Sequence, residues 1–383
     1  MTKTEKLKMK TEERTPLFTR GQFDYPFFAM VMLLLGTGLI MMFSASYPDS
    51  YYSEGNATYY FVRQAIFAVV GVAAMVAISH FDYHKLRALA VPLFVISTIV
   101  LALVPFVGTT RNDATRWIDL GFTTFQPSEI TKIAIIILFA TMATRLGSKM
   151  KTLKYGVVPF FAIIGLIAVL LYMQPHLSAT VIIAMTGVII IFVGGTRLLY
   201  LFGIAGIGAA GAAWYISTKA YAMTRIEVWL DPFIDPLDKG WQGVQSLLAI
   251  GSGGFWGLGL GQSRQKHLFL PEPANDFIFS VVCEELGYVG AILILLAFAM
   301  LIIRGYWIAI RAKDKFGCLL VTGIVSQIAI QTIFNICVVS GLLPITGASL
   351  PFFSYGGTSL LILLAEIGIL LNVSRQIPAP KKG

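Results

Sequence analysis

The sequence predicts an all-α polytopic integral membrane protein with about ten transmembrane helices. The chain is 56% hydrophobic and only 13% charged, whereas soluble domains carry about a quarter charged residues. Its apolar runs are about 17–25 residues long and do not alternate with polar residues, so they suit helices rather than the strands of a barrel. Because the bilayer core offers no water, each span must satisfy its own backbone, as a helix does.

The predicted helices form one membrane domain, 26–375, between a basic tail, 1–25, and a short tail, 376–383. Short polar connections join most of them. The exception, 218–275, is predicted to be a large extracellular loop between the seventh and eighth helices. The predicted segments are 26–46, 61–80, 87–106, 130–146, 155–173, 177–194, 197–217, 276–303, 316–341 and 355–373.

The distribution of lysine and arginine predicts the orientation. These residues gather in both tails and in the even-numbered connections, whereas the first and ninth connections, 47–60 and 342–354, contain none. Since basic connections stay in the cytoplasm, both chain ends are predicted to be cytoplasmic. The net charge of +9 follows from this topology and from anionic lipid, so a nucleic-acid partner is not indicated.

Two outer connections, the third and the seventh, break this charge pattern. The third, 107–129, contains Arg111 and Arg116. Pairing with acidic neighbours such as Asp231 and Asp235 is one explanation for basic residues on the outer side. An anionic ligand held at the outer membrane surface is the other, and the residues alone leave both open. The basic residues of the seventh connection are Lys219, Arg225, Lys239, Arg264 and Lys266.

Ionisable groups are concentrated in "SRQKHLFLPEPANDFIFSVVCEELG", residues 263–287, where a polar loop becomes an apolar helix. Asp276 stands at the start of the eighth predicted helix. A carboxylate there can cap the helix, or it can act as a general base when partly desolvated. His176, in "QPHLSAT", could titrate, but a lone interfacial histidine is more often a hydrogen-bonded surface residue.

The stretch "QPSEITK" is typical of a helix start. Ser128 can cap the free N–H groups, and Glu129 suits the positive end of the helix dipole. Lys132 lies about one turn into the predicted membrane helix, where an ammonium group needs a partner or water. Alternatively, its long side chain reaches outward to the membrane surface.

Two further stretches favour tight backbone packing. "AIGSGGFWGLGLG" is similar to a dinucleotide fingerprint, but no soluble strand–turn–helix unit surrounds it. We expect close backbone packing there, or a loop that bends around a lipid head group. "GLLPITGASLPFFSYGGTS", residues 341–359, is uncharged and predicts a re-entrant or tightly packed outer loop. The three cysteines lack metal spacing and are predicted to be buried free thiols.

Taken together, "RWIDLGF", "QPSEITK", "QSLLAIGSGG", "PEPANDFIF" and "LPITGASLPFFSYGGTSL" resemble the SEDS family, which includes FtsW, RodA and SpoVE. The resemblance runs from about residue 25 to 375, and "SRQKHLFLPEP" and "LLNVSRQ" are closest to the FtsW/SpoVE branch. It implies an inverting peptidoglycan glycosyltransferase of the bacterial cytoplasmic membrane. Such an enzyme polymerises lipid II into β-1,4-linked glycan at the outer face and releases undecaprenyl pyrophosphate, for cell division, elongation or sporulation. The alternatives are a lipid II translocator or a non-catalytic scaffold for a transpeptidase.

The resemblance also implies roles for individual residues. The family's essential aspartate falls on Asp276, which would remove the proton from the acceptor hydroxyl. Basic residues near it would stabilise the charge of the leaving pyrophosphate. His176 stands where many relatives have aspartate, so no role is transferred to it. The candidate phosphate-binding residues are Arg116, Lys132, Arg225, Arg264 and Lys266, and the candidate supporting residues are Trp117, Glu129, Ser263 and Glu272.

Cofactors and partners follow from the resemblance in the same way. No dedicated metal motif is visible, and a divalent cation, Mg²⁺ or Mn²⁺, stays an open expectation because such ions favour phosphate oxygens with a carboxylate or two. The implied partners are lipid II, a class B penicillin-binding protein that supplies the transpeptidase, and other membrane proteins of the divisome or elongasome.

Overall fold

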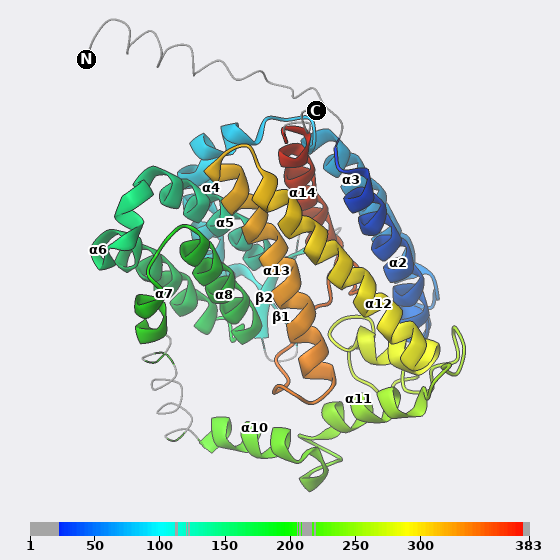
Figure 1. Cartoon of the computed structure of the whole chain (residues 1–383). Helices are drawn as coiled ribbons and strands as arrows, with labels where there is room; N and C mark the ends of the chain where they lie inside the picture. The colour runs from blue at the N-terminus through cyan, green and yellow to red at the C-terminus, as the bar shows by residue number, and fades with distance from the viewer. Residues whose placement is uncertain are drawn as a thin grey trace, which may run out of the picture.

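The two ends of the membrane domain meet on one face of the molecule, as predicted. The backbone N–H of Asp24 donates to Ser374 Oγ over 3.1 Å, and α2 begins where α14 ends (Figure 1). We call this the inner face and the opposite one the outer face. The structure is a computed structural model that describes residues 23–111, 114–119, 121, 123–204, 206, 208, 217 and 220–377.

The described residues contain eight helical spans that are long and apolar enough to cross a membrane, and a shorter apolar helix, α8. They match every predicted segment except 197–217, of which residues 205, 207 and 209–216 lie outside the described residues. The helices are α2 (Tyr25–Glu54), α3 (Tyr59–Ile78), η1 (Tyr83–Lys85) with α4 (Leu86–Val107), α5 (Pro127–Leu146) with η2 (Gly147–Lys151), α6 (Leu153–Gly156) with α7 (Val158–Tyr172), α8 (Leu177–Val193), α12 (Ile278–Arg311), α13 (Lys315–Val339) and α14 (Gly357–Arg375).

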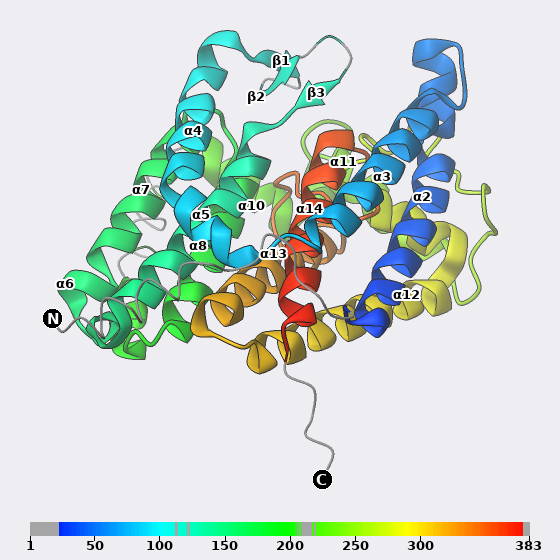
Figure 2. The same ribbon diagram turned by 90° about the horizontal axis from the view of Figure 1, so that it is seen from above.

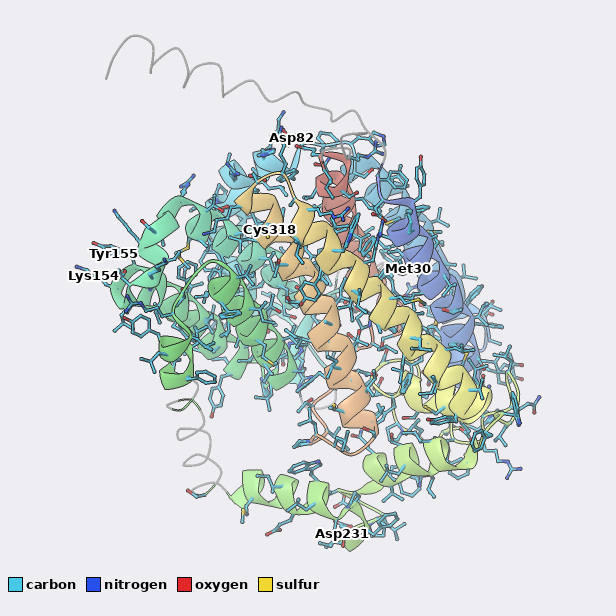
Figure 3. The ribbon with its side chains drawn as sticks, viewed as in Figure 1. Met30, Asp82, Lys154, Tyr155, Asp231 and Cys318 are labelled. Atoms are coloured by element: carbon cyan, nitrogen blue, oxygen red, sulfur yellow. The ribbon has the colours of Figure 1, made fainter. Side chains whose placement is uncertain are left out.

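The seventh connection lies on the outer face. Helix α8 ends on the inner face, where Lys315 Nζ donates to the Gly194 carbonyl over 2.8 Å. The helices α10 (Ala220–Leu230) and α11 (Trp241–Ser252), with η3 (Pro232–Ile234) between them, lie at the opposite end of the molecule (Figure 1). Figure 3 shows the two ends, with Asp82 on the inner face and Asp231 on the outer one. The chain therefore passes from one face to the other between Gly194 and Ala220.

Helix α13 is the centre of the helix assembly (Figure 2). Most of it is buried, whereas α3 and α4 expose much of their surface, as helices that face lipid do. Gln327, Gln331 and Asn335 are buried on α13 and stand four residues apart, so they share one helix face. This row of amides lies in the outer half of α13, and its buried polar groups need hydrogen-bond partners there.

Backbone N–H groups of the glycine-rich stretch form hydrogen bonds with carbonyls that are exposed by a break in α12. The helix is interrupted at Gly287, whose φ is 66°, a value that glycine adopts readily. Loop amides take the freed carbonyls: Leu258 N–H donates to Glu284 O over 2.9 Å, and Gly259 N–H donates to Glu285 O over 3.0 Å. A Cβ on Gly257 would lie 2.1 Å from the Glu285 carbonyl oxygen. Of the two expectations for this stretch, close backbone packing is confirmed.

A small antiparallel sheet covers the outer ends of α4 and α5, where no strand was predicted. Its order is β1 (Thr109–Arg111), β2 (Ala114–Asp119), β3 (Thr124–Phe125), with Thr109 opposite Trp117 and Ile118 opposite Phe125. Threonine, isoleucine and aromatic residues favour strands, but the run is too short to be distinguished from a loop. The sheet holds Arg116 and Trp117 above the helix ends.

Candidate active site

A cavity of about 430 Å³ lies among the outer ends of the central helices. Helices α5, α8, α13 and α14 contribute to its wall, together with β2, the segment before α12 and the loop before α14. Six predicted site residues that are far apart in sequence line this one cavity. They are Arg116, Trp117, Glu129, Lys132, Glu272 and Asp276.

Asp276 is held on the cavity wall by its backbone. Asn335 Nδ2 donates to the Asp276 carbonyl over 2.8 Å, so one amide of the α13 row is used here. Gly347, with φ of 70°, passes so close that a Cβ on it would lie 3.0 Å from Asp276 Oδ2. Burial raises the pKa of the Asp276 carboxyl to about 6, Glu272 adds to the rise, and Arg116 opposes it. The carboxylate is therefore ionised at neutral pH and more basic than an ordinary aspartate.

Lys132 is paired inside the cavity and does not reach outward. Its side chain is 4% exposed. The ammonium group lies 2.8 Å from Glu129 Oε1 and donates to Gln331 Oε1 over 3.2 Å. Glu129 is three residues earlier on α5, on the same helix face. A positive charge is thereby kept in a buried position with a partner that neutralises it.

Arg116 links two walls of the cavity. From β2 its Nη2 donates to the Pro175 carbonyl, just before α8. Its charge acts on the Asp276 carboxyl on one side and on the His176 ring on the other. His176 is 6% exposed, so the expectation of a surface histidine is wrong: the turn before α8 folds inward against the cavity.

Two of the predicted phosphate-site residues, Arg264 and Lys266, and the predicted supporting residue Ser263 lie elsewhere, which corrects the expectation that they share one site. Lys266 is 3% exposed, and its Nζ lies 2.8 Å from Glu285 Oε1 and donates to Ser44 Oγ over 2.9 Å. Ser263 Oγ donates to Glu284 Oε2 over 2.5 Å. The backbone N–H of Arg264 donates to Glu284 Oε1 over 2.9 Å. None of the three lines the cavity.

The reason lies in two adjacent glutamates at the break of α12. Glu284 and Glu285 are fully buried, and a buried carboxylate needs donors or a counter-ion. The loop before Asp276 supplies them, so Lys266 serves Glu285 rather than a ligand. The side chain of Arg225, the remaining candidate, lies outside the described residues.

The cavity also contains residues that the sequence did not assign to the site. Its inner end is formed by Gln327 and Glu366, where Gln327 Nε2 donates to Glu366 Oε2 over 2.9 Å. Glu366 lies midway along α14 and is fully buried. The signal available from sequence was a set of polar residues inside apolar runs, but only the packing of α13 against α14 shows that they meet.

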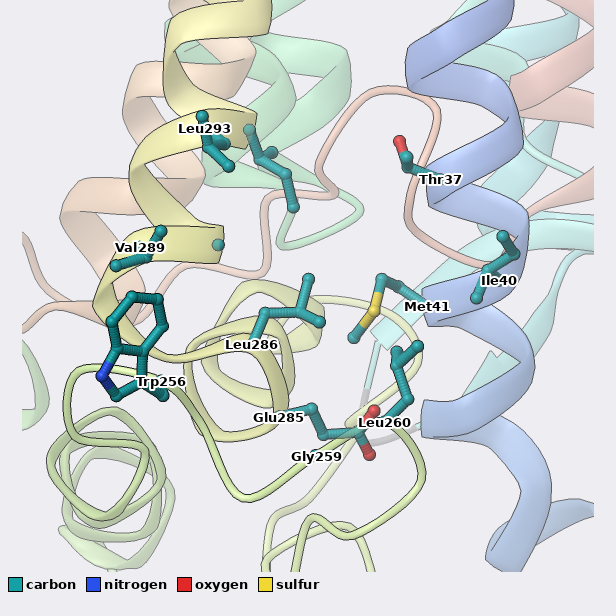
Figure 4. A pocket seen from close by; sticks show the side chains of 12 residues that line it. Thr37, Ile40, Met41, Trp256, Gly259, Leu260, Glu285, Leu286, Val289 and Leu293 are labelled. Carbon is teal, nitrogen blue, oxygen red and sulfur yellow. The ribbon is translucent and has the colours of Figure 1, made fainter.

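A second cavity, of about 540 Å³, lies between α2 and α12 and has a different character (Figure 4). Ile40 and Met41 of α2 face Leu286 and Leu293 of α12 across it. Its lining is almost wholly apolar, and none of the predicted site residues belongs to it. Within the described ranges, no group of three or more His, Cys, Asp or Glu could hold a metal ion.

The fold and the first cavity define a polytopic membrane protein whose outer half encloses a carboxylate beside basic residues. The sequence profile of the FtsW/RodA/SpoVE family, described as "Cell cycle protein", matches residues 25–378. The chain belongs to this family. It is a multi-pass membrane protein, and its bacterial relatives place it in the bacterial cytoplasmic membrane.

Relatives and solved structures agree with this assignment. The chain is 42% identical to stage V sporulation protein E of Bacillus subtilis, over 90% of this chain and 95% of that protein. It is 38% identical to a probable peptidoglycan glycosyltransferase FtsW of Geobacter, over 93% and 97%. The structure superposes with a TM-score of 0.76 and 27% identity on a chain from a study of polymerisation and crosslinking by a peptidoglycan synthase complex, covering 92% and 98%. For RodA of Thermus thermophilus the TM-score is 0.69 at 25% identity, covering 94% and 98%.

Proposed function

We propose that the protein is an inverting peptidoglycan glycosyltransferase that polymerises lipid II at the outer face of the cytoplasmic membrane. One observation carries the proposal: Asp276, with its raised pKa, shares a single cavity with Arg116 and Lys132. The names of the FtsW relatives support the same reaction class.

In the proposed reaction, Asp276 removes the proton from the 4-hydroxyl of the acceptor sugar. The oxygen attacks the donor anomeric carbon from the side opposite the pyrophosphate. The new C–O bond forms as the bond to the phosphate oxygen breaks, and undecaprenyl pyrophosphate leaves with the electron pair. Attack from the opposite side inverts the anomeric centre and gives a β-1,4 link. General-base catalysis of this kind contributes about 10² to 10⁴ in rate.

Arg116 and Lys132 are proposed to stabilise the pyrophosphate. Negative charge grows on its oxygens as the bond breaks, and fixed cations in a desolvated cavity stabilise that charge most strongly. Glu129 neutralises Lys132 over 2.8 Å. A bound pyrophosphate would compete with Glu129 for this ammonium group. Until the pyrophosphate binds, the ion pair with Glu129 prevents a buried unpaired charge on Lys132. Arg225 stays a candidate for the same role.

The implied partners and the divalent cation also belong to this proposal. A class B penicillin-binding protein would supply the transpeptidase, alongside other divisome or elongasome proteins. The structural neighbour in a peptidoglycan synthase complex supports such a partner. Because the described residues offer no dedicated metal ligands, Mg²⁺ or Mn²⁺ would be held mainly by the substrate's phosphate oxygens.

The translocator alternative needs polar groups along the whole way across the bilayer. In the part of the chain that the structure describes, the cavity lining ends at Glu366. Beyond it, towards the inner face, α14 continues with buried Ile367, Leu370 and Leu371, which pack in the core. A pyrophosphate would lose its polar contacts there, so the arrangement favours chemistry at the outer end. A scaffold has no need for a basic carboxylate beside cations.

The decisive experiment is a polymerisation assay with purified protein, lipid II and the transpeptidase partner. We expect Asp276→Asn to reduce glycan polymer at least about a hundredfold, because the amide cannot accept the proton. Asp238→Asn is the matched control, since Asp238 is exposed on the outer loop and does not line the cavity.

Polymer at the wild-type rate from Asp276→Asn would remove the general base from the proposal. Lipid II flipping in vesicles, measured with the same variant, tests the translocator alternative separately from the glycosyltransferase proposal. A chelator added to the wild-type reaction tests the divalent cation: unchanged synthesis would eliminate the ion.

A further inference from the structure

His176 is a buried titratable group of the cavity that the proposed reaction does not use. It precedes α8 and lines the cavity. Its turn is held by hydrogen bonds: the His176 N–H donates to the Leu171 carbonyl over 3.1 Å, and Gln174 Nε2 donates to the Leu101 carbonyl over 2.7 Å. Arg116 binds the carbonyl of Pro175. The ring is therefore held against the cavity by three elements.

A single hydrogen bond of the ring assigns its tautomer. Gln126 Nε2 lies 3.4 Å from His176 Nε2. An amide nitrogen only donates, so the ring Nε2 accepts and the proton sits on Nδ1. His176 Nδ1 is buried and has no hydrogen-bond partner among the described residues. A buried donor without a partner is uncommon in proteins and points to a group that arrives from outside.

The charges around the ring define what that group is. The charged groups that line the same cavity are Arg116, Glu129, Lys132, Glu272, Asp276 and Glu366. Burial, followed by the charges of Arg116 and Lys132, lowers the pKa of His176 to about 3. The imidazole is thus a neutral donor on which two cations act, and an anion is the ligand that its Nδ1–H and both positive charges favour.

The position of the ring relative to Asp276 places this anion next to the reacting atoms. Ser178 Oγ, two residues after His176, donates to the Gly347 carbonyl over 3.1 Å. Gly347 in turn lies against Asp276 Oδ2. The histidine turn and the carboxylate therefore face the same part of the cavity, with Arg116 acting on both.

We propose that His176 is a third ligand of the substrate's diphosphate group and takes up a proton when that anion binds. The proposal rests on the proposed function and adds a pH-dependent step to it. Burial and the charges of the two cations keep the ring neutral. A diphosphate brings negative charges to the same place, which reverses the electrostatic effect and favours the imidazolium ion.

The sign of the pH dependence follows from linkage. Since the pKa of His176 is higher in the complex than in the free protein, binding gains from protonation at low pH. The gain is lost as pH rises through the pKa of the complex. An opposite charge nearby raises a histidine pKa by about 1 to 3 units, so the bound-state value falls within an accessible pH range.

The direct test is NMR of protein labelled with ¹³C at histidine Cε1, titrated with UDP-N-acetylglucosamine. This probe is a sugar-linked diphosphate diester that neither gains nor loses a proton near neutral pH. Only four histidines contribute signals, and single His→Gln variants assign them. Without probe, we expect the His176 signal to stay in the neutral form down to about pH 5. At saturation it should titrate with a midpoint at least about 1 unit higher than in the free protein.

A neutral His176 signal that does not respond to saturating probe would overturn the proposal. The second measurement is kcat/KM for lipid II. We expect His176→Gln to lower it about tenfold at about pH 5, with the ratio to wild type approaching one towards about pH 8. His267→Gln is the control, because His267 is exposed on the outer loop and does not line the cavity.

A loss that is the same at every pH would show a structural role for His176 and would also overturn the proposal. The proposed function and the inference about His176 fail in distinguishable ways. Absence of polymer from wild type and from His267→Gln would remove the proposed function. Polymer from both, together with an unresponsive His176 signal, would remove only the inference about His176.

Discussion

The pKa of Asp276 depends on neighbours that can be changed one at a time. Glu272 raises it and Arg116 lowers it. Since the base acts only when deprotonated, we expect kcat/KM for lipid II to fall as pH drops below about 6. Glu272→Gln removes a negative neighbour, lowers the pKa, and moves this acid limb to lower pH by up to about 1 unit. An acid limb that stays in place or moves to higher pH would contradict the assignment.

Gly347 tests whether the space beside Asp276 matters. An alanine Cβ there would lie 3.0 Å from Asp276 Oδ2 and 3.8 Å from Arg116 Nη1. We expect Gly347→Ala to reduce polymerisation at least about tenfold by displacing the carboxylate. Gly341→Ala is a matched control, because Gly341 has a similar φ of 76° but only Leu247 Cδ2 near its Cβ position, at 3.8 Å. Equal losses in both variants would show that backbone strain alone is responsible.

At the scale of elements, the loop before Asp276 is attached to α12 by a buried ion pair. Lys266 and Glu285 are 3% and 0% exposed in their side chains. Removing one partner leaves the other charge buried, so we expect Lys266→Met to destabilise the protein by about 3 to 5 kcal/mol. Glu285→Gln combined with Lys266→Met should cost less than the sum of the single changes. Thermal unfolding in detergent measures both, and additive effects would show that the pair is not coupled.

Other elements show where pattern reasoning from the sequence succeeds. The apolar runs predicted the helices because length and hydropathy alone decide whether a segment can span a bilayer. The predicted first connection, 47–60, is shorter in the structure, since α2 continues to Glu54 through Pro48. The sheet of β1 to β3 was missed because its pairing depends on contacts between short strands, not on periodicity.

At the scale of the whole molecule, the proposal requires the seventh connection to lie outside the cell. We expect Asp238→Cys, in a variant without the native cysteines, to react with an impermeant maleimide on intact cells. Lys313→Cys, exposed on the inner face between α12 and α13, should react only after the membrane is opened. The opposite labelling pattern would place the cavity in the cytoplasm and exclude lipid II polymerisation at the outer face.

The sequence by itself determined the membrane class and the family and made Asp276 a candidate site residue, because these depend on composition, on segment length and on motifs that are contiguous in the chain. Only the tertiary structure decided which charges meet. Lys132 and Lys266 are both basic residues near an outer helix end. One lines the cavity beside Gln331, and the other is buried against Glu285. The physical reason is that a buried charge pairs with whatever packing brings within a few ångströms, and that distance is set by helices far apart in the sequence.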